Sequence, residues 1–421
     1  MNDHDAHPER DERDPQEPAT PTVSRPFDIP ENHLDVIVTP GSVDPTRKAS
    51  LRTTLIAVIS MPVFFLLAFT LCYVSATHAP VPHDMAISLA GEPGTTEQLA
   101  SAIEAEAPSA FDIARTPSAE RAVEAVEYRD VVGAVIVDGT EVRAVVASGG
   151  GRLAAATVTT LAGRVAEELE SSSAPVIDEV APLPSDDPGG SILFFLVVIC
   201  TVGAFLSVSG FAQAFPRARL RSMVATAAGA ALLVPVLGFA MISVYVDFEA
   251  TFGTVATVMG IGMIYTFTVG LLATFLTTTL GSASIFAVIL VLIAFNFPSV
   301  GASVPASMLP GFWQVVHDGW VGSGAFEAMR SVLFFEGHQS GRWLLQLLSW
   351  LAGAVALLAA VTLTRARRAA KTPEVEADDG DDEPPVDGAA ADADADAATA
   401  TAAAGAASPE PVADRANARH A

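Results

Sequence analysis

Six long apolar segments constrain this fold more than any other feature of the sequence. The hydrocarbon core of a bilayer is about 30 Å thick, so a helix needs ~20 apolar residues to cross it. The six segments, which meet or approach this length, are residues 51–73, 192–215, 223–246, 253–276, 282–297 and 343–363. The segment at 282–297 is the shortest. The sequence predicts an α-helical polytopic membrane protein with six transmembrane helices.

Basic residues in the short connections predict the orientation of these helices, because Lys and Arg are retained on the cytoplasmic side. One cluster precedes the first helix, one separates the second from the third, and one follows the sixth: Arg47, Lys48 and Arg52; Arg217, Arg219 and Arg221; Arg365, Arg367, Arg368 and Lys371. Six spans place all three clusters on one side. We therefore expect a multi-pass protein of the plasma membrane with both termini in the cytoplasm.

The formal net charge of -25 lies almost entirely outside the apolar segments. Residues 1–50, 76–190 and 372–421 hold 43 of the 48 acidic residues. A nucleic acid partner requires an extensive basic surface, which this composition excludes. The lipid bilayer is the partner that the composition predicts.

The apolar segments divide the chain into seven regions. Residues 1–45 and 372–421 are acidic and lack an apolar period, so we predict two disordered tails. Between them we expect an interface segment with the first helix (46–75), an extracytoplasmic domain (76–190), the second to fifth helices (191–297), an interfacial loop on the outer face (298–341), and the last helix with its basic flank (342–371).

The region between the first two helices reads as a small α/β domain. Strands are predicted at residues 85–89, 131–137 and 142–147, and Asp138-Gly139 between the last two is typical of a hairpin turn. Helices are predicted at residues 95–107, 118–128 and 153–169, with Thr95 as the cap of the first. In the later loop, 298–341, apolar and aromatic residues predict short helices at the outer interface, with Trp313 and Trp320 in the aromatic belt.

No motif in the sequence indicates catalysis. A Walker A loop needs Gly-Lys-Ser/Thr, and neither lysine follows a glycine; Gly-x-Ser-x-Gly, His-Glu-x-x-His and Cys/His clusters are also missing. The adjacent His317 and Asp318 are more typical of a solvated loop than of a catalytic dyad. We expect no enzyme, no cofactor and no metal. The apolar segments also contain no carboxylate, which disfavours a proton-driven pump.

Two features leave alternatives open. Small residues in the third, fourth and sixth segments, such as Gly229, Gly262 and Gly353, are as compatible with packing inside one subunit as with a dimer contact. The basic loop at residues 216–221 is explained by anchoring alone, or, with residues 44–55, it docks a cytoplasmic partner.

Several motifs carry a family resemblance. Residues 125–137, the sequence Val-Ala-Pro-Leu-Pro-Ser-Asp-Asp-Pro-Gly at 180–189, and the segments 308–315 and 324–337 resemble actinobacterial membrane proteins of the ABC-2 permease-like group, related to YhgE/Pip and DUF3533 proteins. The resemblance covers roughly residues 51–368 and excludes both tails. A domain of about 110 residues separates the first two helices here, whereas ABC-2 permeases typically have a short loop there.

The resemblance implies an exporter permease subunit that forms a homodimer or heterodimer and is energised by a separate ATPase. Its substrate class would be amphipathic, lipid-like or drug-like. The candidate docking residues are Arg217, Arg219, Arg221, Arg47, Lys48 and Arg52, and an outer-face motif of structural character comprises Pro310, Phe312, Trp313, Glu327 and Arg330. The alternative is a non-transporting scaffold or secretion accessory whose extracytoplasmic domain binds an envelope partner.

Overall fold

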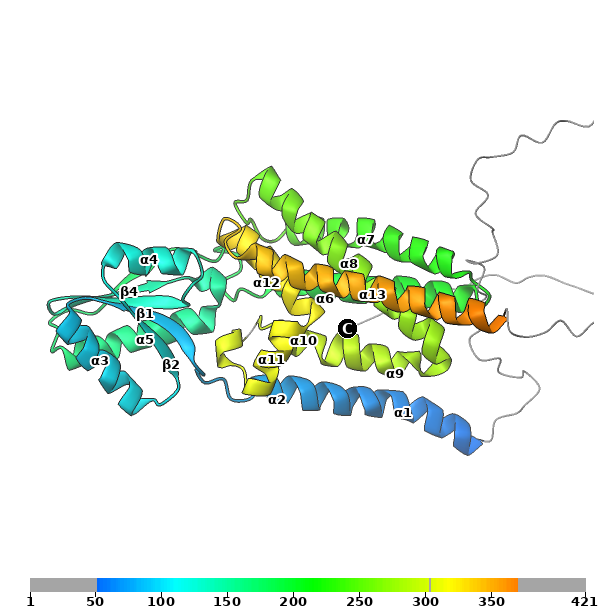
Figure 1. The fold of residues 1–421 in the computed structure, drawn as a ribbon, viewed down its shortest axis with the longest axis horizontal. Helices are drawn as coiled ribbons and strands as arrows, with labels where there is room; N and C mark the ends of the chain where they lie inside the picture. Colours follow the sequence, from blue (N-terminus) through cyan, green and yellow to red (C-terminus); the bar gives the residue numbers. More distant parts are fainter. Residues whose placement is uncertain (1–50, 303, 370–421) are drawn as a thin grey trace, which may run out of the picture. The chain divides into compact units, whose positions relative to one another are not determined.

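The computed structural model describes residues 51–302 and 304–369 (Figure 1). Within these ranges, five helical segments are long and apolar enough to cross a membrane: Val58–Thr77, Ile192–Ala214, Leu220–Ile242, Phe252–Leu280 and Ser340–Arg368. This is the architecture of a polytopic α-helical membrane protein, as predicted. The two predicted tails lie outside the described residues.

The segment predicted as the fifth span is short and broken. It consists of α9 (Ser284–Val288), a π-helical turn η5 (Ile289–Ala294) and α10 (Asn296–Ser299). At 1.5 Å per residue, an apolar helix over Ser284–Ser299 is about 24 Å long, less than the ~30 Å of the hydrocarbon core. The count of six spans therefore stays a prediction.

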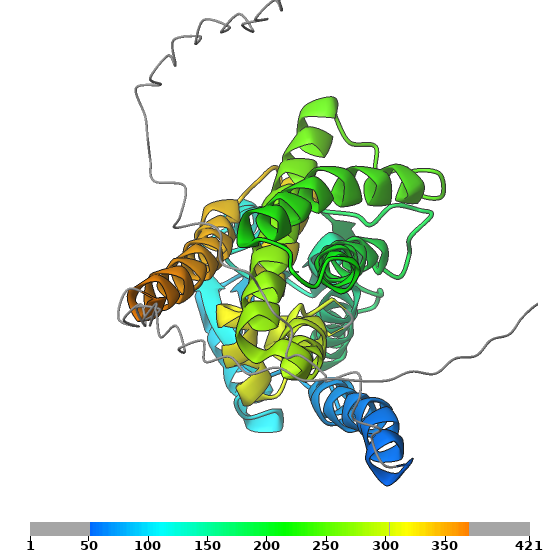
Figure 2. The same cartoon turned by 90° about the vertical axis from the view of Figure 1, so that its right-hand side faces the viewer.

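The first membrane helix lies at the periphery. Helix α1 (Leu51–Phe69) continues through a π-helical turn, η2 (Thr70–Val74), into α2 (Ser75–Thr77). In the view of Figure 2, α1 (blue) stands at the edge of the other helices. It contacts α9 and η5, where the rings of Phe64 and Phe286 meet edge to face at 5.1 Å. Most of its large apolar side chains are exposed, as expected of a surface facing lipid or another apolar partner.

The main bundle consists of α6 (Ile192–Ala214), α7 (Leu220–Ile242), α8 (Phe252–Leu280) and α13 (Ser340–Ala369). Helix α6 buries residues at helical spacing along one face: Leu193, Leu196, Val197, Cys200, Ala204 and Val208. This spacing places one stripe of the helix against its neighbours and leaves the other side free. The stripe packs with Met223 of α7 and Tyr265 of α8 in one core.

A five-stranded sheet forms the domain between α2 and α6. Its strands are β1 (Met85–Ala90), β2 (Phe111–Thr116), β3 (Gly133–Asp138), β4 (Glu141–Val146) and β5 (Val176–Glu179), in the order β2-β1-β3-β4-β5. Only β3 and β4 pair antiparallel. Helices α3 (Pro93–Glu106) and α5 (Arg152–Glu168) share one core with the sheet, and α4 (Ala119–Glu127) packs in a second core. A small α/β domain is therefore present.

In this domain, short sequence patterns predicted one hairpin and two helices correctly and one helix cap incorrectly. The hairpin at Asp138-Gly139 and the helices at 118–128 and 153–169 are confirmed. Thr95 as a helix cap is wrong: Glu92 is the N-cap, and Pro93, whose fixed φ suits a first helical residue, begins the helix. Strands β2 and β5 were not predicted, because each is an edge strand with few apolar residues.

The later loop folds into a 3-10 turn η6 (Ala306–Met308) and two helices, α11 (Gly311–Gly319) and α12 (Val321–Phe334). Short helices are confirmed, but α12 does not rest at a surface. Its residues 321–331 are all buried, and it contacts α6, α8, α10 and α13. Trp313 is also buried against the protein, so its ring does not lie in an exposed aromatic belt. Small residues on α12, including Gly322, Ser323 and Ala325, allow this close packing.

Candidate functional site

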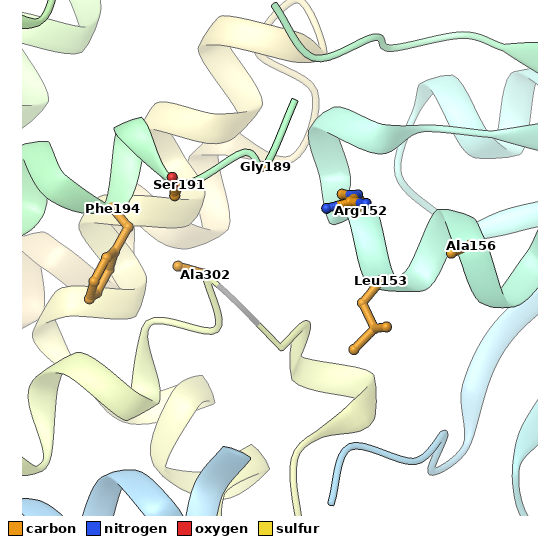
Figure 3. A pocket seen from close by; sticks show the side chains of 7 residues that line it. All are labelled: Arg152, Leu153, Ala156, Gly189, Ser191, Phe194 and Ala302. Carbon is orange, nitrogen blue, oxygen red and sulfur yellow. The ribbon is translucent and has the colours of Figure 1, made fainter. Parts of the chain in front are cut away.

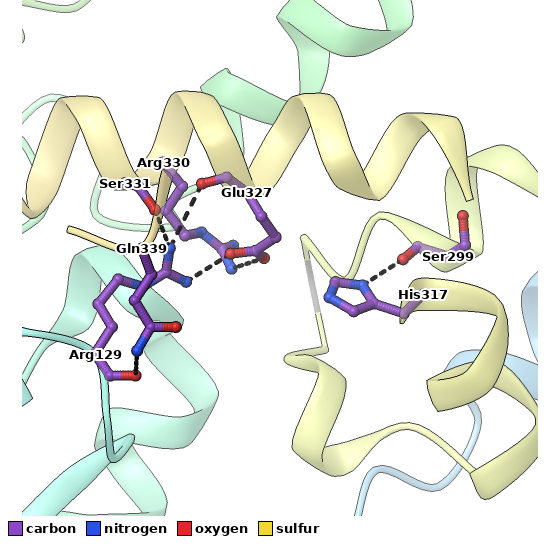
Figure 4. Close-up of polar contacts among 7 residues, drawn as sticks. All are labelled: Arg129, Ser299, His317, Glu327, Arg330, Ser331 and Gln339. Atoms are coloured by element: carbon purple, nitrogen blue, oxygen red, sulfur yellow. Dashed lines mark hydrogen bonds and ion pairs between the residues drawn. The ribbon is translucent and has the colours of Figure 1, made fainter. Parts of the chain in front are cut away.

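A buried cluster of charges joins α12 to the sheet domain (Figure 4). Arg129, which follows α4, places Nη2 2.6 Å from Oε2 of Glu327 on α12. Nη1 of Arg330 lies 2.6 Å from the other carboxylate oxygen, Oε1. Arg129 also donates to Oγ of Ser331 at 2.5 Å. One carboxylate thus binds two guanidinium groups that come from different parts of the molecule.

Burial makes this cluster energetically demanding. The side chains of Glu327, Arg330 and Arg129 are only 5%, 6% and 15% exposed. Burial raises the pKa of Glu327, but the positive charges of Arg330 and Arg129 lower it by more, so the pKa lies below that of an ordinary carboxyl group. Glu327 is therefore ionised at neutral pH. Separating the two elements would break the Arg129–Glu327 pair and leave Glu327 with Arg330 alone. Loss of one partner from a buried ion pair costs about 3–5 kcal/mol.

The backbone around Arg129 aims its side chain at α12. Arg129 has φ of 63°, and the amide of Asp130 bonds the carbonyl of Ala125, which is the geometry of a left-handed helix end that usually favours glycine. Gln339 donates to the carbonyl of Arg129 at 3.0 Å. The ring of His338 stacks on Tyr128 at 4.0 Å. The turn after α12 therefore contacts the residues that follow α4, including Arg129 of the charge cluster.

A row of buried polar groups continues from the cluster region into the bundle. Nδ1 of His317 donates to the carbonyl of Ser299 at 2.7 Å. Asn296 of α10 donates to the hydroxyl of Tyr265 at 2.8 Å, and that hydroxyl lies 2.6 Å from Oγ1 of Thr201 on α6. All five residues are buried. Polar groups buried inside a membrane protein rarely occur without a structural or functional reason.

His317 is neutral in this setting. Burial lowers its pKa, and this effect exceeds the opposing influence of Glu327, of the bond to Ser299 and of Asp318. The pair His317 and Asp318 does not form a dyad: Asp318 binds Arg342 at 2.9 Å on the exposed side. Among the described residues, no group of His, Cys, Asp and Glu side chains is arranged to hold a metal ion.

The structure separates the predicted outer-face motif into two places. Glu327 and Arg330 form the buried pair on α12. Pro310 is the N-cap of α11, and Phe312 and Trp313 lie in its first turn. Nε1 of Trp313 donates to Oγ of Ser75 at 3.0 Å, and Phe312 is 61% exposed. The first place ties α12 to the sheet domain, and the second ties α11 to the end of the first membrane helix.

The predicted docking residues lie at exposed positions. Arg217, Arg219 and Arg221 lie at the turn between α6 and α7. Arg217 and Arg219 line a hollow of about 700 Å³ together with Phe211 and Phe215. Arg52 is exposed near the start of α1, while Arg47 and Lys48 lie outside the described residues. Arg365 near the end of α13 donates to the carbonyl of Thr278 and so joins the ends of α13 and α8.

Sequence reasoning missed Arg129. It lies 198 residues from Glu327 and is flanked by the polar residues Tyr128 and Asp130, so it resembles an ordinary surface arginine. The one local signal is its place directly after the helix end, where glycine or asparagine is usual.

No protein-family model, curated protein or solved structure matches this chain.

Proposed function

We propose that this chain is the membrane permease subunit of an ABC-2-like exporter that moves an amphipathic, lipid-like or drug-like substrate and is energised by a separate ATPase. The observation that carries the proposal is the buried ion pair between Arg129 and Glu327, which links the sheet domain to α12. A helix buried among α6, α8, α10 and α13 is tied by charge to a domain that lies beside the bundle in the fold. A rearrangement of the bundle helices therefore moves the domain with it.

The broken segment α9–η5–α10 supports the same proposal. Irregular backbone at membrane depth is tolerated where it is packed inside protein or lines a cavity, and broken helices are a feature of transporters. Here the break is followed by the buried polar row through Asn296 and Tyr265. An anchor for a passive scaffold needs neither feature.

In this proposal the broken segment is the fifth of six spans and both termini are cytoplasmic. The sheet domain is then extracytoplasmic, and the exposed arginines Arg217, Arg219 and Arg221 face the ATPase. Two permease subunits, identical or different, alternate between inward and outward access. This proposal follows the interpretation of residues 51–368 given in the sequence analysis.

The test uses inside-out membrane vesicles from cells that produce the full chain and its partner ATPase. We expect ATP-dependent accumulation of a fluorescent lipid analogue, and an active ATPase that co-purifies with the chain in mild detergent. Changing Arg217, Arg219 and Arg221 together to Ala should abolish both. The matched control changes three exposed arginines of the sheet domain, Arg115, Arg121 and Arg164, to Ala and should retain both.

Recovery of the wild-type chain without an ATPase, together with no ATP-dependent accumulation, would refute the permease proposal. The scaffold alternative rests on one observation: edge strand β5 exposes Val176 (64%) and Ile177 (47%). Exposed edges can pair with a strand of another protein. Under that alternative, Val176→Lys should abolish binding of an envelope partner, whereas the permease proposal expects transport to persist.

A further inference from the structure

A cavity of about 400 Å³ lies where the sheet domain meets the first turn of α6 (Figure 3). Its walls come from the start of α5, the segment that leads into α6, and the loop after α10; the lining residues are Arg152, Leu153, Ala156, Gly189, Ser191, Phe194 and Ala302. A smaller cavity of about 30 Å³ shares Arg152, Gly189 and Ala302 with it and reaches Arg330 of α12. The larger space is therefore adjacent to the buried charge cluster.

Arg152 gives the cavity a positive charge that has no partner among the described residues. Among the described residues of the sheet domain, Arg115, Arg129, Arg143 and Arg164 each pair with a carboxylate. Arg152 is exposed and has no ion pair or hydrogen bond from its side chain to any described residue. A cation in the first turn of a helix is also unfavourable to that helix. Helix stability therefore does not explain its position.

Among the described residues, one carboxylate, Asp187, lines either cavity, and it already has hydrogen-bond partners. Asp187 accepts hydrogen bonds from the amides of Ser191 (3.1 Å) and Ile192 (2.9 Å) and so caps the start of α6. Its charge is directed at the backbone rather than at Arg152. At the other side of the cavity, α5 begins without a side-chain cap, so its first amides add to the attraction for an anion.

Apart from Ser191, whose hydroxyl donates to Asp187 at 3.5 Å, the remaining lining side chains are apolar. Leu153, Ala156, Phe194 and Ala302 offer carbon surface, and Phe194 is the third residue of a membrane-spanning helix. Charge and apolar surface thus lie side by side at one end of the span. Figure 3 shows Arg152 and Leu153 on one side of the space and Phe194 and Ala302 on the other. A free inorganic anion would bind at the polar groups and leave the apolar surface of Leu153, Phe194 and Ala302 uncovered.

We infer that this cavity binds an amphiphile with an anionic, phosphate-type headgroup, which contacts Arg152 while its apolar part lies along Phe194. As a statement about the substrate class of the permease, this assignment rests on the proposed function. Binding itself requires neither transport nor an ATPase. It is therefore testable on the isolated full chain.

The test measures lipid bound to the purified full chain by native mass spectrometry in mild detergent. Dioleoyl phosphatidylglycerol supplies the anionic headgroup, and dioleoyl phosphatidylcholine has the same acyl chains with a zwitterionic one. We expect tighter binding of phosphatidylglycerol to the wild type, weakened about tenfold by Arg152→Gln, since a hydrogen bond to a charged group is lost. Ala156→Phe keeps the charge but fills the space, and should weaken binding similarly.

The matched control is Arg121→Gln. Arg121 is another exposed arginine in the first turn of a helix, α4, without an ion pair among the described residues, but it lines neither of these cavities. It should leave lipid binding unchanged. An equal effect of Arg121→Gln and Arg152→Gln, or equal binding of the two lipids, overturns the inference.

A third arm adds inorganic phosphate in place of lipid. If phosphate occupies the site as tightly as phosphatidylglycerol does, the ligand is a free anion and the amphiphile assignment is wrong. If the chain binds lipid but vesicles show no ATP-dependent accumulation, the permease proposal is wrong and the binding site stands. If Arg152→Gln abolishes lipid binding but ATP-dependent accumulation persists, the permease proposal stands and the substrate assignment is wrong.

Discussion

At the scale of single residues, the stability of the buried charge cluster depends most on the side chain of Glu327. Its carboxylate neutralises part of the charge of Arg129 and Arg330 in a buried environment. Replacing a buried ion pair as a whole is often tolerated, but removing one partner leaves the other charge buried. A substitution of Glu327 therefore acts through Arg129 and Arg330, which lose their counter-charge.

We expect Glu327→Gln to destabilise the protein by about 3–5 kcal/mol, because two guanidinium groups lose their counter-charge. The measurement is thermal unfolding of the purified protein in mild detergent. Asp318→Asn is the control, since it breaks the exposed pair with Arg342 and should cost no more than about 1 kcal/mol. Equal losses for the two variants would contradict a buried, tightly coupled cluster.

The stability should also fall in mild acid because of His317. Its pKa is lowered in the folded state by burial, so the unfolded chain binds a proton at higher pH than the folded one. Stability is complete above the ordinary pKa, about 6.5, and declines below it by up to about 1.4 kcal/mol per pH unit. Unfolding midpoints measured from pH 7.5 to 5.5 test this.

His317→Asn should flatten that pH dependence, because asparagine keeps a donor for the carbonyl of Ser299 and does not titrate in this range. His338→Asn, at a half-buried position where the ring bonds the carbonyl of Glu127, should leave the decline in place. A decline that persists in His317→Asn would assign it to another group.

At the scale of elements, α12 is held by its small residues. A methyl group added to Gly322 would overlap Oδ1 of Asn296 and lie 2.8 Å from its Cγ. Among the described residues this Oδ1 has no hydrogen-bond partner. The packing of α10 against α12 therefore has no room for a side chain at this position.

We expect Gly322→Ala to destabilise the protein by about 1–3 kcal/mol through overpacking, again measured by thermal unfolding. Gly353→Ala on α13 is the matched control, because its added methyl group meets no atom within 4 Å. Helix propensity favours alanine there by up to about 1 kcal/mol. A neutral Gly322→Ala would mean that α10 and α12 are not packed as described.

At the scale of the whole molecule, the open question is the number of spans. Labelling of single cysteines in intact cells answers it, in a background where Cys72 and Cys200 are replaced by Ala. With six spans, a membrane-impermeant maleimide should label Ser172→Cys from outside. It should reach Arg217→Cys and Arg367→Cys only after lysis.

If the segment 284–299 does not cross the membrane, Arg367→Cys would instead be labelled in intact cells while Arg217→Cys stays protected. Each variant must be produced at wild-type levels for the comparison to hold. This pattern would also contradict a cytoplasmic C-terminus, on which the docking of a single ATPase surface depends.

Sequence alone determined the features that rest on local periodicity and length. The apolar segments, the hairpin at Asp138-Gly139 and the helices α4 and α5 follow from spacing within about twenty residues. The membrane class follows from the same segments, since most of them are as long and as apolar as a membrane-spanning helix requires.

Only the tertiary structure decided which distant residues meet. Arg129 and Glu327 are far apart in sequence, and neither carries a local signal of burial. The apolar and aromatic residues near α12 could not reveal whether lipid or protein covers them, because both are apolar surroundings. The edge strands β2 and β5 form through pairing with strands elsewhere in the chain. Contacts of this kind depend on how the elements pack, which local spacing does not encode.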